Sequence, residues 1–300
     1  MINKFHQLIE RAKAKGGVNI AVACAQDEDV LKALMDAAKL GIVKGFLVGD
    51  EAQIRKIASD IEFDFARYGF EIVHEADMAQ AALTAVTLVS SGRANVVMKG
   101  LVDTSIILKA VLNKEVGLRT GNVLSHVALF DVPTYHKFLI LTDAAMNIAP
   151  DLGTKKQILE NALAVTKALE IDEPNVGVIA AKEKVAESMP ATIDAGALVE
   201  QWKNGEIKGC KVGGPFALDN AISKEAAQTK GLQDPMAGEV DILLMPTIEA
   251  GNVLYKALNF LANAVSAGVI VGAKAPIVLT SRADSEASKL YSIALAVLMG

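Results

Sequence analysis

The sequence predicts an α/β protein of two domains, in which short buried strands alternate with longer helices. Three observations indicate this class. Apolar runs rich in β-branched residues recur along the chain, with helical patterns between them. Of the 300 residues, 52% are hydrophobic but only 5% are aromatic, which is typical of parallel strands covered by helices on both faces. The chain is also about twice as long as a typical domain.

The first part of the chain opens with a helical pattern. Residues 1–17 carry charges throughout, so we expect an amphipathic helix there and no signal peptide. The next apolar run, 18–23, predicts a strand, and 29–40 predicts the helix that follows it. The same alternation predicts strands at 44–48, 71–73 and 95–98, and helices at 78–90 and 106–112.

The second part of the chain continues this alternation. Because strands and helices follow one another repeatedly, we expect parallel or mixed sheets with right-handed crossovers. The predicted strands are 127–130, 138–141, 176–180, 209–212, 242–245, 269–271 and 277–279.

The domain boundaries are predicted from the order of these elements. No segment rich in proline, glycine or serine separates two halves, so ordered chain must cross between the domains. We expect a first domain of residues 1–130 plus 275–300 and a second domain of residues 131–274. This division places a cleft between the two domains.

Composition excludes several classes of protein. A net charge of −5 gives no indication of nucleic-acid binding. Cys24 and Cys210 lie far apart and form no CxxC, so we expect two buried thiols in a reducing compartment. The longest uncharged run, 257–273, contains polar residues and is too short for a membrane span. These features predict a soluble, cytoplasmic protein.

Familiar catalytic and metal-binding motifs are missing from the sequence. It has no Walker loop, no GxGxxG after the first strand, no HExxH and no GxSxG. The four histidines are scattered, and no cysteine or histidine cluster has the spacing of metal ligands. We therefore expect no metal and no cofactor.

The first candidate site segment is 98–105, which follows a predicted strand and precedes a helix. Gly100 permits a tight turn, and Thr104 or Ser105 can cap the helix. A helix N-terminus beside the Lys99 ammonium attracts a phosphate group. The alternative is an ordinary capped helix with a solvated lysine.

The second candidate segment is 117–126. Arg119 stands in a loop flanked by glycines, where its guanidinium can hold a phosphate through two hydrogen bonds; the alternative is a solvated arginine. Ser125 and His126 are adjacent, but neighbouring residues on a strand point to opposite faces. The sequence places no carboxylate beside His126, so a buried histidine is favoured over a catalytic one.

The third candidate segment, 246–256, also joins a strand to a helix. Gly251 and Asn252 suit a backbone that approaches a ligand closely. The alternative is a plain strand–turn–helix junction, in which Glu249 is favoured by the helix dipole.

In the fourth candidate segment, 277–286, Ser281 and Arg282 stand at the end of a predicted strand. A hydroxyl and a guanidinium beside the first turn of a helix suit an oxyanion, since both donate hydrogen bonds. The alternative for Asp284 and Ser285 is a purely structural role, because both residue types commonly cap helices.

Six segments, taken together and in order, resemble the phosphate acetyl/butyryl transferase family. The resemblance is closest to its phosphate butyryltransferases and runs from about residue 18 to residue 298. The segments are MKGLVDTSIILKAVLN, VLSHVALFDVP, LTDAAMNIAP, IKGCKVGGPFALDNAIS, MPTIEAGNVLYKAL and GAKAPIVLTSRADSEASKLYSIALA.

This resemblance implies a two-domain α/β fold similar to that of isocitrate and isopropylmalate dehydrogenases, assembled as a homo-oligomer. The implied reaction is butanoyl-CoA + phosphate ⇌ butanoyl phosphate + CoA, by direct transfer. Acyl-CoA and phosphate are then the small-molecule partners. The alternatives are an acetyl-preferring phosphate acetyltransferase, a non-catalytic module that binds CoA or an acyl phosphate, and a metal-dependent hydroxyacid dehydrogenase.

The resemblance also assigns residues. A serine–arginine pair of the related acetyltransferases matches Ser281 and Arg282, which are the expected catalytic residues. A serine/threonine pair of their first domain matches Thr104 and Ser105. The expected phosphate- or CoA-binding residues are Lys99, Thr104, Ser105, Arg119, Ser125, Gly251, Asn252 and Asp284.

Two departures from the acetyltransferase pattern affect the mechanism. The aspartate that stands seven residues after their serine is Ser288 here, and their cysteine in the segment matching 142–147 is Ala144. The second departure excludes an acyl-cysteine at that position. The first leaves the general base unassigned, with Asp284 and Asp143 as candidates.

Overall fold

The computed structural model describes residues 1–280 and 284–300. Its contacts divide the chain into two compact units. The N-terminal unit comprises residues 5–122 and 267–300, and the central unit comprises residues 1–4 and 123–266. The domains predicted above have boundaries near 130 and 274, and their independence as domains stays a prediction.

The N-terminal unit is built on a mixed sheet with the strand order β3-β2-β1-β4-β11-β10. The first five of these strands are parallel, and β10 is antiparallel to β11. Strand β10 begins two residues before the unit's second segment. The strands are β1 (Val18–Ala23), β2 (Val43–Gly49), β3 (Phe70–His74), β4 (Val96–Lys99), β10 (Val265–Val271) and β11 (Ile277–Val278).

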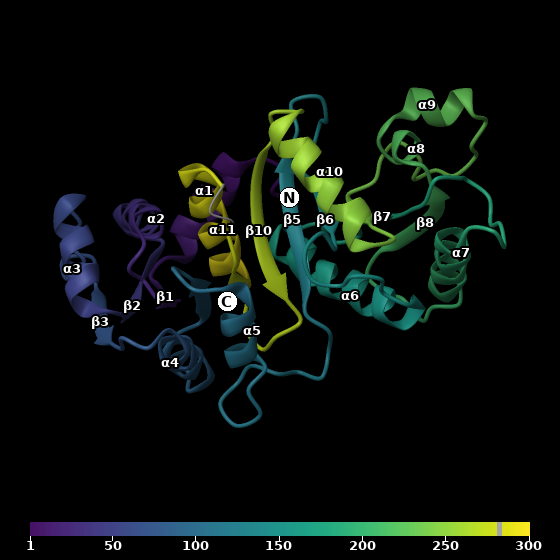
Figure 1. Ribbon diagram of the computed structural model, residues 1–300. Coiled ribbons are helices and arrows are strands. Elements are labelled where there is room, and N and C mark those ends of the chain that lie inside the picture. The colour runs from purple at the N-terminus through teal and green to yellow at the C-terminus, as the bar shows by residue number, and fades with distance from the viewer. Residues whose placement is uncertain (281–283) are drawn as a thin grey trace. The chain divides into compact units, whose positions relative to one another are not determined.

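Helices cover both faces of this sheet (Figure 1). Helices α2 and α3 lie on one side of the strands and α4 on the other, while α11 contacts both α1 and α2. Helix α2 shows why: its apolar residues recur at helical spacing and are buried, and Asp27 caps its first turn by accepting the Val30 N–H. The helices are α1 (Phe5–Lys15), α2 (Glu28–Lys39), α3 (Glu51–Asp60), α4 (Met78–Ser90), α5 (Thr104–Val111) and α11 (Glu286–Met299).

The central unit is built on strands in the order β5-β6-β9-β7-β8. Strand β5 is antiparallel to β6, and the other neighbours are parallel. The strands are β5 (Ser125–Asp131), β6 (Leu139–Thr142), β7 (Asn175–Ile179), β8 (Lys211–Phe216) and β9 (Ile242–Leu244). Its helices are α6 (Leu152–Ala168), α7 (Pro190–Lys203), α8 (Leu218–Ile222), α9 (Lys224–Thr229) and α10 (Ile248–Phe260), with α6 and α7 on one side of the strands and α8 to α10 on the other (Figure 1).

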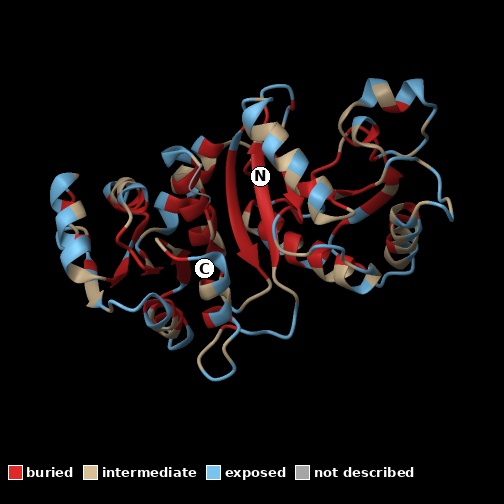
Figure 2. Cartoon of the chain, viewed as in Figure 1, coloured by how far each residue is buried: buried red, intermediate tan, exposed pale blue. Residues whose placement is uncertain are grey.

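The strands of both units are buried, whereas the helices expose one side (Figure 2). Each strand predicted from the sequence is present, although the bounds differ at the ends, most for β8. The prediction that Thr104 or Ser105 caps α5 is wrong: the N-cap is Asp103, and the helix begins at Thr104. No helix among the described residues is long and apolar enough to cross a membrane.

Both cysteines are free and buried, as the sequence predicted. Burial raises the pKa of the Cys24 and Cys210 thiols to about 11. Because the thiolate is the reactive form, we expect neither thiol of the native protein to react readily with a thiol reagent at pH 8. Titration should give two thiols per chain after denaturation in urea; rapid reaction of a native thiol would contradict this.

Candidate active site

The loops after β1 and β4 are joined at the carboxyl ends of these neighbouring parallel strands. The Gly100 N–H donates to the Ala23 carbonyl at 2.8 Å, and the Leu101 N–H donates to the Cys24 carbonyl at 2.7 Å. A Cβ on Gly100 would lie 2.2 Å from the Cys24 carbonyl oxygen, so only glycine permits this approach. Ligands of open α/β sheets bind at such strand ends.

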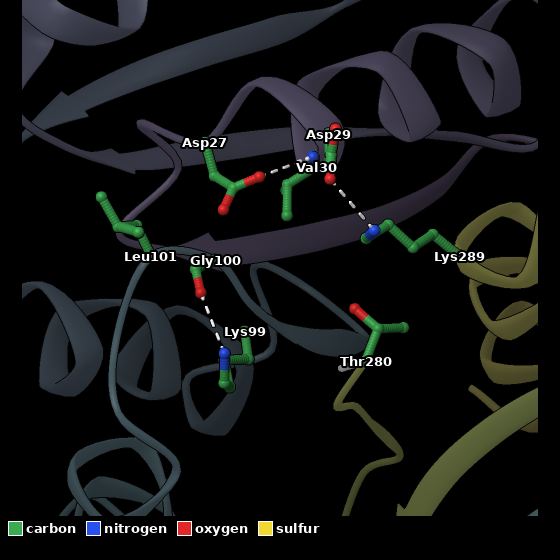
Figure 3. Close-up of a pocket in the computed structure, with 8 residues that line it drawn as sticks. All are labelled: Asp27, Asp29, Val30, Lys99, Gly100, Leu101, Thr280 and Lys289. Atoms are coloured by element: carbon green, nitrogen blue, oxygen red, sulfur yellow. Dashed lines mark hydrogen bonds and ion pairs between the residues drawn. The ribbon is translucent and has the colours of Figure 1, made fainter. Parts of the chain in front are cut away.

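A cavity of about 250 Å³ opens at this point of the N-terminal unit (Figure 3). The end of β4 contributes Lys99, the start of α2 contributes Asp29, and α11 contributes Lys289. The complete lining is Asp27, Asp29, Val30, Lys99, Gly100, Leu101, Thr280 and Lys289. Two ammonium groups and a threonine hydroxyl give the cavity hydrogen-bond donors for an anion.

Lys99 is half-buried in this cavity, and its ammonium donates to the Gly100 carbonyl at 3.2 Å. Asp284 is tied to the same place through its backbone, because the Lys289 ammonium donates to the Asp284 carbonyl at 2.7 Å. Of the sequence-predicted residues, Lys99 lines the cavity, whereas Asp284 does not line it, although its carbonyl contacts a lining residue, Lys289. Lys289 was not predicted.

Ser281 and Arg282, the expected catalytic pair, lie outside the described residues. The residues on either side are described. Thr280 is buried and lines the cavity, and Ser285 caps α11 by accepting the Ser288 N–H at 3.1 Å. The Ser288 hydroxyl lies 3.0 Å from the Ser285 hydroxyl, so the residue at the acetyltransferases' aspartate position takes part in the helix cap.

Three of the other expected binding residues are exposed and do not line this cavity. Thr104 and Ser105 are exposed at the start of α5. Arg119 is exposed in a loop held on both sides: the Lys274 N–H donates to the Leu118 carbonyl, and the Thr120 hydroxyl donates to the Gly272 carbonyl. Their ligand-binding roles stay a prediction.

In the central unit, Ser125 stands at the start of β5 and is fully buried. Asn161 of α6 donates to the Ser125 hydroxyl oxygen and to the Val123 carbonyl, each at 2.9 Å. His126 is also buried, but its ring packs edge-on against Tyr255 of α10, with ring centroids 5.7 Å apart. The two side chains point to opposite faces of the strand, as the sequence predicted.

Gly251 and Asn252, in the first turns of α10, contact the turn that follows β6. The Asn252 side-chain amide donates to the Ala144 carbonyl at 3.2 Å. A Cβ on Gly251 would lie 2.2 Å from the Asp143 carbonyl oxygen. Glycine is therefore needed at 251 for α10 to approach this turn.

Asp143 is 3% exposed and anchors the same turn. Its Oδ1 accepts the N–H groups of Ala145 at 2.8 Å and Met146 at 3.1 Å. Its Oδ2 accepts the Asn147 N–H at 3.1 Å and the Asn147 side-chain amide at 2.6 Å. A carboxylate whose oxygens are occupied in this way acts as a turn anchor, which favours a structural role over the general-base role considered above.

Replacing Gly251 with alanine should lower the free energy of unfolding by about 3 kcal/mol, because the added methyl group overlaps backbone atoms that cannot rotate away. Urea denaturation measures this loss. The matched control is Gly153→Ala in the first turn of α6, where a Cβ meets only an Asp151 side-chain oxygen at 3.8 Å. That change should leave stability equal or up to about 1 kcal/mol higher. Equal effects of the two changes would contradict this prediction.

Two relatives of different acyl preference match along almost the whole chain. The phosphate butyryltransferase of Clostridium acetobutylicum is 49% identical over 299 residues, which cover 100% of this chain and 99% of the relative. The phosphate acetyltransferase of Rhizobium meliloti is 42% identical over 296 residues, covering 99% of this chain and 93% of the relative.

Solved structures agree with the predicted fold. A branched-chain phosphotransacylase from Enterococcus faecalis V583 superposes with a TM-score of 0.82 and 33% identity, covering 94% of this chain and 98% of that one. A 4-hydroxythreonine-4-phosphate dehydrogenase from Klebsiella pneumoniae superposes with a TM-score of 0.59 and 12% identity over 95% of this chain, which shows the fold alone. The dehydrogenase-like α/β fold expected from the sequence is thereby confirmed.

Residues 68–297 match the phosphate acetyl/butaryl transferase family. This match extends over both units and includes Lys99, Asp143, Gly251 and the Ser281–Arg282 pair. Together with relatives of the same chemistry along its whole length, it shows that the chain belongs to the phosphate acetyl/butaryl transferase family and is a phosphate acyltransferase.

Proposed function

We propose that this phosphate acyltransferase is a phosphate butyryltransferase, which exchanges the CoA of butanoyl-CoA for inorganic phosphate. The observation that supports the butanoyl preference is the difference in identity between the two relatives, 49% against 42% over nearly full lengths. The product is butanoyl phosphate, and the reaction runs in both directions.

In the proposed mechanism, a phosphate oxygen attacks the thioester carbonyl carbon of butanoyl-CoA. The new C–O bond forms, the C–S bond breaks, and CoA leaves as a thiolate that takes up a proton. Ser281 donates a hydrogen bond to the developing oxyanion or to the leaving sulfur, and Arg282 holds the phosphate. One preorganised donor lowers such a barrier by about 3–4 kcal/mol, and holding both substrates together lowers it further.

Direct transfer is favoured over a covalent acyl-cysteine. Ala144 occupies the position at which the related acetyltransferases have a cysteine. Cys24 and Cys210 are buried, and burial raises the pKa of both thiols to about 11. A nucleophilic cysteine needs an accessible thiolate near neutral pH, and neither of these has one.

The second candidate function is a phosphate acetyltransferase with the same chemistry. The Rhizobium meliloti relative keeps this candidate open, since 42% identity over nearly the whole chain also supports it. One methylene in an acyl pocket changes discrimination by only about 1–3 kcal/mol, so a few side chains decide the preference.

The experiment is a measurement of phosphate-dependent CoA release from acyl-CoAs of two to six acyl carbons, followed with a thiol reagent. We expect the highest kcat/KM with the four-carbon substrate. Omitting phosphate is the control for simple hydrolysis. A maximum at two carbons would replace butanoyl with acetyl, and the absence of phosphate-dependent release from every substrate would overturn the proposal.

We further propose that the enzyme acts in the cytoplasm as a homo-oligomer. Support for an oligomer is the resemblance to its family described above. Light scattering at micromolar concentration tests this: a mass equal to that of one chain would contradict it.

A further inference from the structure

Lys289 is a buried cation at a position that disfavours positive charge. It is the fourth residue of α11 and only 3% exposed. Removing an ammonium group from water costs free energy, and the positive end of the helix dipole adds to that cost. A lysine at such a position needs an anionic partner for its stability.

Among the described residues Lys289 has two hydrogen-bond acceptors, and one of these hydrogen bonds is weak. Its ammonium donates to the Asp284 carbonyl at 2.7 Å, whereas the Asp29 carboxylate oxygen lies 3.4 Å away. The Asp29 side chain is 52% exposed, so water screens its charge. An ammonium group has three N–H donors, and this arrangement therefore suits an additional or stronger acceptor.

The cavity at Lys289 has the size and the donors for that acceptor. Figure 3 shows Lys289 on α11 and Lys99 at the end of β4, with Thr280 on the same side of the cavity as Lys289. About 250 Å³ is room for several water molecules or for one phosphate group. Asp27 accepts the Val30 N–H with its Oδ1 as the cap of α2, whereas Asp29 is the carboxylate that contacts Lys289 and competes for it.

We propose that Lys289, with Lys99, binds a phosphate group of the substrates in this cavity, and that the phosphate oxygen replaces Asp29 as the partner of the ammonium. The proposal rests on the phosphate acyltransferase function described above. Two sources of the group share this chemistry: inorganic phosphate and the phosphates of CoA.

Variants of the two charged partners should have opposite effects, which separates a ligand site from a structural ion pair. Lys289→Met should raise the dissociation constant of the phosphate group about 10- to 100-fold, because a charge-assisted hydrogen bond is lost. Asp29→Asn should lower it about two- to fivefold, because the competing carboxylate is removed. Lys289→Arg keeps the charge and should restore part of the affinity.

The matched control is Lys32→Met, which removes a cation of α2 that pairs with Glu28 and does not line the cavity. It should leave the affinity for phosphate unchanged. Lys289→Met leaves Asp29 half exposed to water, so no buried carboxylate is left without a partner and the variant is expected to fold. If Lys289→Met does not fold, Asp29→Asn provides an independent measurement.

Binding is measured first with inorganic phosphate alone, by calorimetry at fixed ionic strength. KM values for phosphate, butanoyl-CoA and its 3′-dephospho analogue follow. A change in phosphate binding assigns the cavity to inorganic phosphate. A change limited to butanoyl-CoA and absent from the dephospho analogue assigns it to the 3′-phosphate, and a change with both CoA substrates assigns it to the diphosphate.

The proposal is overturned if Lys289→Met and Asp29→Asn weaken binding equally, or if neither changes the affinity for any of these ligands. Calorimetry with phosphate does not depend on acyl transfer. If the wild-type protein binds phosphate through Lys289 but does not use butanoyl-CoA, the proposed site therefore stands and only the proposed function is overturned.

Discussion

Replacing Ser281 with alanine is expected to lower kcat by on the order of a hundredfold or more, because a hydrogen bond to charge that develops in the transition state is lost. The KM values for phosphate and acyl-CoA should change little, since such a donor acts mainly after the substrates are bound. Steady-state kinetics with butanoyl-CoA and phosphate, each varied in turn, measures both effects.

The matched control for this change is Ser288→Ala in the same segment. The Ser288 hydroxyl contacts Ser285 at the cap of α11, so its loss should affect stability slightly and kcat by less than about threefold. Near-native turnover of the Ser281→Ala enzyme would remove this serine from the mechanism. A large loss of kcat in Ser288→Ala alone would place the chemistry at the position of the acetyltransferases' aspartate.

Replacing Asp143 with asparagine is expected to lower the free energy of unfolding by about 2–4 kcal/mol. The carboxylate accepts four hydrogen bonds, two on each oxygen. In asparagine one oxygen becomes an NH₂ group, which then faces the two donors of Asn147 in a site that is closed to water. Urea denaturation followed by circular dichroism measures the loss.

Asp151→Asn is the matched control. Asp151 is an exposed N-cap of α6 that accepts the Thr154 N–H at 2.8 Å, and asparagine caps helices about as well as aspartate. Its loss of stability should stay within about 0.5 kcal/mol. If Asp143→Asn kept native stability but lost its turnover at all pH values, Asp143 would be the general base instead of a turn anchor.

The sheets were predictable because their sequence signal is strong. Runs such as 18–23, with Asn19 as its one polar residue, and 242–245 are apolar, and the structure places strands β1 and β9 there. The sequence predicted a tight turn at Gly100 and a close approach to a ligand at Gly251. In the structure both glycines lie against a neighbouring backbone, and the ligand role of Gly251 stays a prediction.

The polar contacts that define the site were less predictable. Lys289 belongs to a segment, Ser288–Lys289–Leu290, that is compatible with a solvated helix surface; its burial depends on α2 and on the turn before α11. Asn161 lies 36 residues from Ser125 in the chain, and no sequence spacing links them. Such pairs are set by tertiary packing, which residue patterns within one segment do not encode.

The cap of α5 shows a different kind of error. Asp, Thr and Ser follow one another at 103–105, and all three residue types are accepted at a helix N-cap. The sequence predicted Thr104 or Ser105 as the cap, whereas the N-cap is Asp103 and the helix begins at Thr104. The choice among adjacent capping residues depends on where the preceding loop ends, which is here fixed by Gly100 and Leu101.

The parallel pairing of β4 with β11 has a consequence for the order in which the chain folds on the ribosome. Strand β4 is made early, but its partner Ile277–Val278 and helix α11 are made only after the whole central unit. Until then, one edge of β4 offers unpaired N–H and carbonyl groups on a buried-type apolar strand. A chain that ends before residue 277 would therefore keep this edge open and be prone to aggregate through it.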